Sequence, residues 1–241
     1  MIDKNFLLNY ANKSQTSLTN VLREYAQHIF LREFYSGKNK SENFLFKGGT
    51  ALRLVFGSPR FSEDLDFSAK KNSVDYEQVL ENVLLGLANE GIEVDLKESK
   101  VTSGGHLASI EVKLLNQSIE IQNQISFRSK LKLAAETVLI NSDIAPSYNV
   151  TLLSRELLVT EKLMALLDRK KSRDFFDLYF ILRANELRSE LRLDSNQRQK
   201  ILEVLTKLPR AKLALDLKRL LPKSFWLIVK DLPATLRREL A

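Results

Sequence analysis

Two short stretches decide the fold: residues 47–52 read KGGTAL, and residues 60–67 read RFSEDLDF. The apolar run at 44–46 predicts a strand before the glycines, and residues 51–56 predict a short helix after them. Glycines allow a backbone to approach a bound group closely, and unpaired N–H groups at a helix start favour an anion. The first stretch therefore predicts a turn that holds phosphate.

The second stretch carries two aspartates. Asp64 and Asp66 are two residues apart in an extended apolar setting, which places both carboxylates on one strand face, roughly 6.5 Å apart along it. At about 4 Å they would repel by roughly 4 kcal/mol at an effective dielectric of 20. A solvated edge is the alternative, but the flanking Leu65 and Phe67 argue against it. The pair predicts a Mg²⁺ ion shared with a substrate phosphate.

Composition excludes several classes of site. The 241 residues include no cysteine and only two histidines, His28 and His106, so thiolate metal sites and cysteine nucleophiles are ruled out. His28 falls on the more polar side of its predicted helix, and we expect it at the surface. The net charge of +7 suits a polyanionic partner such as nucleic acid, although a basic solvated surface explains it equally well.

Targeting signals are not evident in the sequence. The first residues lack the order of a signal peptide, and no apolar run approaches the 18 or so residues of a membrane span. We expect a cytoplasmic protein that does not enter a membrane.

The chain reads as an α/β fold, a mixed β-sheet core with a helical C-terminal half. Hydrophobic periodicity predicts helices at 18–34 and 74–90, and extended segments at 92–96, 107–114 and 119–127.

The last third of the chain reads differently, as helices punctuated by Pro209, Pro222 and Pro233. The expected helices are 157–167, 175–187, 197–208 and 213–221. We therefore expect a core domain at 1–145, with an N-terminal covering helix, and a helical domain at 146–241.

The two stretches together resemble the nucleotidyltransferase superfamily, in which a glycine turn holds the triphosphate and an Asp-x-Asp strand binds magnesium. More narrowly, they resemble the AbiEii/AbiGii toxins of type IV toxin–antitoxin and abortive-infection systems, to which the MenT toxins are related. A second cluster supports the likeness: EKLMAL at 161–166, Arg169, and RDFFDLY at 173–179. The resemblance covers residues 44 to 180.

The resemblance implies a role for each matching residue. Lys162 would steady the triphosphate charge, although it could instead pair with Glu161 or Asp168 on a helix surface. Arg173 and Asp177 could form a pair that only stabilises a helix. The implied nucleotide-binding residues are Gly48, Gly49, Thr50 and Arg53, the metal ligands are Asp64 and Asp66, and the remaining catalytic residues are Lys162 and Asp174.

One position departs from the family pattern. Many nucleotidyltransferases carry a third carboxylate on a later strand, and the corresponding residue here is Gln124, which cannot act as a base. Glu120 shares its face but lies about 13 Å away along an extended strand. Asp174 is the first choice for the base, and impaired catalysis stays open.

The expected function is transfer of a nucleotide from an NTP to an RNA acceptor, with the tRNA 3′ end as the leading candidate and a cognate antitoxin as partner. A binding module with weak or lost catalysis is the alternative, as is an enzyme of this fold that modifies a protein or small molecule. Seven basic residues could form an RNA-facing patch or a solvated helical face: Arg183, Arg188, Lys207, Arg210, Lys212, Lys218 and Arg219.

Overall fold

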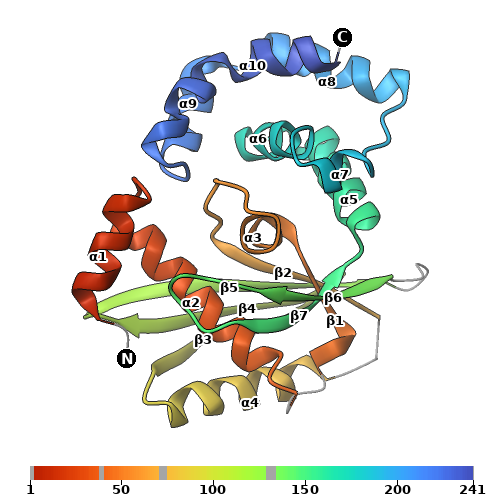
Figure 1. The fold of residues 1–241 in the computed structure, drawn as a ribbon. Coiled ribbons are helices and arrows are strands. Elements are labelled where there is room, and N and C mark those ends of the chain that lie inside the picture. Colours follow the sequence, from red (N-terminus) through yellow and green to blue (C-terminus); the bar gives the residue numbers. More distant parts are fainter. Residues whose placement is uncertain (1–2, 38–40, 71–74, 129–133, 241) are drawn as a thin grey trace. The chain divides into compact units, whose positions relative to one another are not determined.

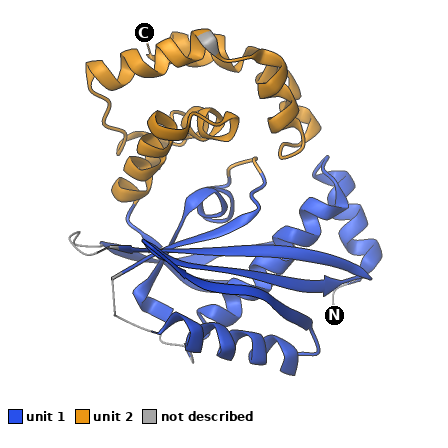
Figure 2. Ribbon diagram, turned by 180° about the vertical axis from the view of Figure 1, so that it is seen from behind, with its two compact units in different colours: residues 1–57, 61–154 blue, residues 58–60, 155–241 orange. Residues whose placement is uncertain are grey.

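The chain forms two compact units, shown in two colours in Figure 2. The sheet unit comprises residues 1–57 and 61–154, and the helical unit comprises residues 58–60 and 155–241. The computed structural model describes residues 3–37, 41–70, 75–128 and 134–240. The predicted class, a mixed sheet followed by helices, is confirmed.

A mixed sheet organises the first unit (Figure 1). In the described residues it has seven strands in the order β3-β4-β5-β2-β1-β7-β6. The β1–β7 and β2–β5 pairs are parallel, and the other pairs are antiparallel. The strands are β1 (Phe44–Lys47), β2 (Asp64–Lys70), β3 (Glu93–Thr102), β4 (Gly105–Leu114), β5 (Gln117–Arg128), β6 (Ala135–Ile140) and β7 (Tyr148–Leu153). The two stretches that decide the fold thus supply neighbouring central strands.

The centre of this sheet is buried. Every residue of β1 is buried, as expected of a strand covered on both faces. The Phe34 ring lies 5.7 Å from that of Phe44 and 5.0 Å from that of Phe67. Each fully buried aromatic side chain contributes about 1.5–3 kcal/mol. These rings fix one helix to the two strands that carry the candidate site.

Four helices accompany the sheet: α1 (Lys4–Lys13), α2 (Leu18–Phe34), α3 (Gly48–Leu54) and α4 (Tyr76–Asn89). Three begin at side-chain caps: Asp3 accepts from Phe6 N–H, Ser17 from Asn20 N–H and Asp75 from Glu77 N–H. Figure 1 shows α3 and α4 on opposite sides of the sheet.

His28 is not at the surface, and the prediction for it was wrong. It is only 2% exposed, and its Nδ1 lies 2.9 Å from the Tyr148 hydroxyl. Burial, helped by the nearby Arg53 charge, lowers the pKa of His28 to about 4. The reason is tertiary: α2 packs against α1, α4, β5 and β7, so its more polar side is covered as well.

The helical unit has its own core. Its apolar centre includes Phe175, Phe176, Leu217 and Leu236, each fully buried. Its helices are α5 (Arg155–Arg169), α6 (Ser172–Ile181), α7 (Asn185–Arg188), α8 (Ser195–Lys207), α9 (Arg210–Lys218) and α10 (Trp226–Leu240).

Pro233 does not end a helix, contrary to the sequence prediction, because α10 continues through it. An interior proline removes one backbone hydrogen bond and costs about 3 kcal/mol. Val229, Leu232 and Leu236 are buried at a spacing of three and four residues. Their burial offsets the loss, so packing decides the helix length.

The strands β6 and β7 were not anticipated. Exposed and partly buried residues alternate in β6, a weak pattern expected of an edge strand. The pairing of β7 with β1 and β6 keeps residues 148–153 in the sheet, so the sheet unit runs beyond the expected boundary at residue 145.

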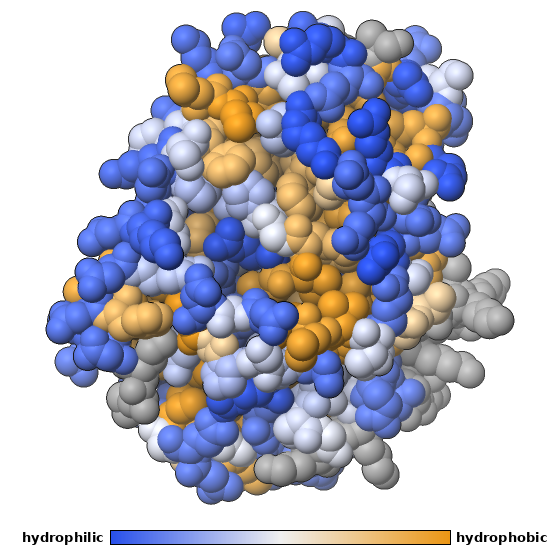
Figure 3. Space-filling view, viewed as in Figure 1, coloured by the Kyte–Doolittle hydropathy of each residue, from blue (hydrophilic) through white to orange (hydrophobic). Residues whose placement is uncertain are grey.

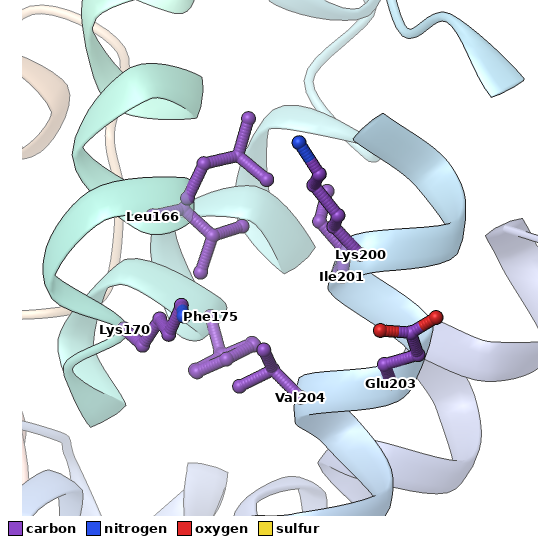
Figure 4. A pocket seen from close by; sticks show the side chains of 8 residues that line it. Leu166, Lys170, Phe175, Lys200, Ile201, Glu203 and Val204 are labelled. Atoms are coloured by element: carbon purple, nitrogen blue, oxygen red, sulfur yellow. The ribbon is translucent and has the colours of Figure 1, made fainter. Parts of the chain in front are cut away.

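A small cavity of about 100 Å³ lies between α5 and α8 (Figure 4). Leu166 and Phe175 line it from α5 and α6, and Lys200, Ile201, Glu203 and Val204 line it from α8. Lys200 and Glu203 are exposed, so the cavity is open to solvent on one side. A larger side chain on its apolar wall would make contacts that are absent there.

Hydrophilic residues cover most of the face drawn in Figure 3, with apolar residues in separate patches. The most exposed large apolar side chains of the helical unit are Leu227 at 78% and Leu215 at 76%. Scattered apolar exposure of this kind is normal for a folded surface.

Candidate active site

Gly48 and Asp66 are in direct contact at the centre of the sheet unit. Gly48 adopts φ +83°, which residues with a side chain rarely accept. A Cβ built on Gly48 would lie 2.1 Å from Oδ2 of Asp66 and 2.7 Å from its Cβ. The antiparallel register sets this approach, because Lys47 lies opposite Asp66. The first glycine of the turn therefore has to be glycine.

The two aspartates flank a fully buried leucine on β2. Leu65 is 0% exposed, whereas Asp64 and Asp66 are half-buried, so both carboxylates leave the strand on the face opposite Leu65. Within the described residues, no group of three His, Cys, Asp or Glu side chains could hold a metal ion. A pair of carboxylates still suits Mg²⁺, which commonly takes one or two carboxylates and completes its shell with water and substrate phosphates.

Thr50 ties the start of α3 to β2. Its hydroxyl donates to the carbonyl oxygen of Asp64, and both Thr50 and Gly49 are buried. The family resemblance implies that Thr50 binds nucleotide. In the structure its hydroxyl proton is used within the protein, where it fixes the distance between the glycine turn and the aspartate strand.

Arg53 lies in the last turn of α3, at the opposite end of the helix from Gly48. Its Nε and a terminal nitrogen donate to both carboxylate oxygens of Glu24, at 2.6 and 3.2 Å, and its guanidinium lies 3.9 Å from the Phe61 ring centre. A bidentate pair on this scale orients a guanidinium firmly. These contacts connect α3 to α2, and a role toward nucleotide stays a prediction.

Gln124, the residue at the expected position of the family's third carboxylate, lies directly beside Asp66. The parallel β2–β5 register pairs Asp66 with Gln124 and Asp64 with Gln122. The amide of Gln124 donates to the Gln122 side chain at 3.0 Å. Glu120 lies outside this register and accepts from the Ser109 hydroxyl at 2.6 Å. The strand beside the aspartates thus offers amides at this point.

Lys162 is held by Asp177 in the helical unit. Its Nζ donates to Oδ2 of Asp177 at 2.8 Å, and Arg60 donates to both oxygens of that carboxylate, at 2.8 and 3.1 Å. The side chains of Arg60 and Asp177 are 2% and 1% exposed. Burial alone would raise the pKa of Asp177, but Arg60 and Lys162 outweigh it and hold the pKa well below its usual range.

Asp174 lies in the first turn of α6 and accepts hydrogen bonds there. Its carboxylate accepts from the Arg169 guanidinium at 2.8 Å and from Lys171 N–H at 3.1 Å, an arrangement that caps the helix. These bonds engage both oxygens of a buried group. The role of Asp174 as a base stays a prediction. The structure gives it a second role, which is to cap α6 and pair with Arg169.

Asp177 is the residue whose importance the sequence reading missed. It was treated as a partner for Arg173 on one helix, whereas Arg60 lies 117 residues away along the chain. One signal was available: Arg60 directly precedes the aspartate strand, and Asp177 belongs to the second family-like cluster. Spacing on one helix could not reveal a partner so distant in sequence.

The family model of the nucleotidyl transferase AbiEii toxin, of type IV toxin–antitoxin systems, matches residues 29–225. The chain belongs to this toxin family. The expected likeness is confirmed, and the AbiEii match implies a nucleotide substrate and a cognate antitoxin. Nucleotidyltransferases of this kind generally use a divalent metal. No curated protein matches the sequence.

Solved structures share the fold of this AbiEii family member. MenT4, a nucleotidyltransferase toxin from Mycobacterium tuberculosis, aligns with a TM-score of 0.65 and 20% identity over 100% of this chain and 89% of its own. JHP933 from Helicobacter pylori aligns with a TM-score of 0.58 and 21% identity over 93% and 94%. A putative nucleotidyltransferase from H. pylori gives 0.58 and 21% over 93% and 97%. At these identities, the likeness establishes the fold.

None of the helices in the described parts of the chain combines the length and apolar character needed to cross a membrane.

Proposed function

We propose that this AbiEii family member is a Mg²⁺-dependent enzyme that transfers a nucleotide from an NTP to an RNA acceptor and releases pyrophosphate. The proposed acceptor is the 3′ end of tRNA, and the proposed outcome is arrest of translation in the cytoplasm. A cognate antitoxin would prevent this outcome.

The contact between Gly48 and Asp66 carries the proposal. Because Gly48 has no side chain, the turn packs directly against the carboxylate of Asp66. A Cβ on Gly48 would lie only 2.1 Å from Oδ2 of Asp66. Phosphate oxygens near the turn and a cation at the aspartates would therefore be neighbours. The nucleotide would be positioned by the backbone of Gly48 and Gly49, where no side chain intervenes.

Magnesium would be held by Asp64 and Asp66. Bound there, it would neutralise charge on the phosphates during transfer. The protein's own part is to keep the two carboxylates on one strand face and the turn at fixed distance, which the Thr50 bond to the Asp64 carbonyl supports. In this proposal, Lys162 adds a positive charge, and its pair with Asp177 sets the position of the ammonium group.

The test is incorporation of labelled NTP, with Mg²⁺ and with EDTA, into total RNA, total protein and small acceptors. Wild type is compared with Asp64→Asn and Asp66→Asn. We expect label in tRNA with wild type and Mg²⁺ only, and a loss of at least ~100-fold in either variant. Label in protein or a small molecule instead of RNA would contradict the proposed acceptor.

A cell test addresses the toxin role. Induced expression of wild type is expected to stop growth, and Asp66→Asn is expected to relieve the arrest at equal protein level. Growth arrest that is equally strong with Asp66→Asn would separate toxicity from nucleotide transfer.

A binding module with weak catalysis is the second candidate, and the position of Gln124 favours it. The amide lies in register with Asp66, where a carboxylate base would act on an acceptor hydroxyl. In the weak-catalysis case, wild type binds NTP without forming product, and Gln124→Glu raises transfer. Efficient transfer by wild type, unimproved by Gln124→Glu, argues against this candidate.

A further inference from the structure

Six basic side chains line one cavity within the helical unit. The cavity, here called the basic groove, has a volume of about 620 Å³ and lies between the α5–α6 corner and α9. Its basic residues are Arg169, Lys170, Lys171, Arg173, Lys212 and Arg219. Two of them, Lys212 and Arg219, belong to the patch considered from sequence, whereas the α5–α6 corner supplies the rest.

Acidic groups cancel only part of this charge. Asp216 is the one carboxylate among the described residues lining the groove, and it accepts from the Ser172 hydroxyl at 2.7 Å. Asp174 pairs with Arg169 at 2.8 Å and neutralises that guanidinium, so the other basic side chains outnumber the carboxylates. The groove therefore stays strongly positive, a distribution that favours an anionic ligand with several charges.

The backbone concentrates these charges at the corner. Lys170 adopts φ +54°, a left-handed conformation that is uncommon for lysine, between the end of α5 and the start of α6. The turn brings Arg169, Lys170 and Lys171 to the groove in succession, and all three are exposed. On the opposite wall, Lys212 projects from α9 and is also exposed.

The lining selects phosphate over base. No aromatic side chain is present among the described residues of the groove, so nothing there would stack a nucleobase. Lysine and arginine side chains on two facing walls suit successive phosphates of a strand, and such contacts position a nucleic acid without reading its sequence.

We propose that the basic groove binds the phosphate backbone of the RNA acceptor. This inference rests on the proposed function, in which the acceptor is RNA, and it assigns the binding surface to the helical unit. Binding through the groove would be independent of sequence and strongly dependent on salt, since each neutralised phosphate changes the slope of log K against log salt by about 0.7–0.9.

The experiment measures binding of fluorescent tRNA to the full chain, without NTP, across a salt series. The test variant is Lys171→Ala with Lys212→Ala, which leaves the Lys171 backbone N–H bond to Asp174 in place. The matched control is Lys230→Ala with Arg238→Ala, which removes two exposed charges of α10 outside the groove. Circular dichroism melts establish that both variants are folded.

We expect the groove variant to bind tRNA at least ~10-fold more weakly at moderate salt, with a salt slope smaller by about 1.4–1.8, and the control to bind like wild type. A scrambled RNA of equal length should bind as tightly as tRNA. Equal losses in both variants, or no loss in the groove variant, would overturn the inference. So would tighter groove-dependent binding of polyglutamate than of RNA, which would indicate an acidic protein as the ligand.

Nucleotide transfer is assayed separately on the same preparations. Asp66→Asn should abolish transfer while leaving tRNA affinity unchanged, whereas the groove variant should keep NTP binding. If wild type transfers a nucleotide to RNA but the groove variant binds RNA normally, the groove assignment fails and the proposed function stands. If wild type labels only protein or small molecules and binds no RNA, both fail.

Discussion

Gly48 and Asp66 approach each other so closely that a side chain on the glycine would overlap the carboxylate. A Cβ would lie 2.1 Å from Oδ2 of Asp66, and φ at Gly48 is +83°. Two independent constraints, one on the backbone and one on space, therefore act at one residue. The same contact sets where the aspartate can point.

Substitution Gly48→Ala is expected to displace Asp66, reduce nucleotide transfer by ~100-fold, and destabilise the fold by about 1–3 kcal/mol. Gly91 provides a matched control, because its φ is +78° but nothing lies within 4 Å of its Cβ position. Gly91→Ala should carry only the backbone strain and keep transfer. Kinetics and urea unfolding of both variants check this, and equal activity in the two would refute the steric argument.

The parts of the site that the sequence predicts are those set by local chemistry. The glycine turn and the Asp64–Asp66 alternation each depend on neighbours within a few residues, and the structure places them together. The family resemblance singled out Gln124, and the structure places it beside Asp66 in the parallel β2–β5 register. Alternation along one strand fixes which residues share a face but does not fix this register.

Contacts between residues that are far apart in the sequence cannot be predicted from local patterns. The bond between Arg60 and Asp177 spans 117 residues, and the buried contact of His28 is with Tyr148 of β7, a strand not expected from the pattern. The interior Pro233 of α10 depends likewise on buried leucines around it. In each case tertiary packing outweighs a local preference.

Asp177→Asn is expected to destabilise the helical unit by about 3–5 kcal/mol, because it leaves the buried Arg60 and Lys162 charges without their carboxylate. The pKa of Asp177 is depressed in the folded state, so its contribution is complete above its unfolded pKa and is lost as pH falls through the folded value. The free energy of unfolding of wild type should therefore decrease below about pH 4.

Urea titrations at pH 7 and pH 3 measure both effects. Exposed Asp168 provides the control through Asp168→Asn. At pH 7, Asp177→Asn should unfold at a lower urea concentration than wild type. Between pH 7 and pH 3, its stability should fall by less than that of wild type. A midpoint equal to that of Asp168→Asn would show that the buried pair adds nothing to stability.

Filling the cavity between α5 and α8 should stabilise the helical unit. Val204→Ile adds one methylene toward a void of about 100 Å³ and is expected to contribute about 0.5–1 kcal/mol. Val204→Ala enlarges the same void and should cost about 1–2 kcal/mol. Thermal unfolding of the two variants distinguishes filling from overpacking, since a lower melting temperature for Val204→Ile would mean that the wall cannot accommodate the added group.

His28 should make the sheet unit sensitive to mild acid. Its pKa is about 4 in the folded chain, against 6.5 for an exposed histidine, so the unfolded chain binds more protons between these values. The stability contributed by the neutral ring is complete above pH 6.5 and falls as pH is lowered toward 4, by up to about 3 kcal/mol. His28→Gln removes the titrating group but keeps a polar side chain for Tyr148. Urea midpoints between pH 7 and pH 4.5 should therefore fall more steeply for wild type than for His28→Gln, and parallel curves would mean that His28 is protonated in the folded state without penalty.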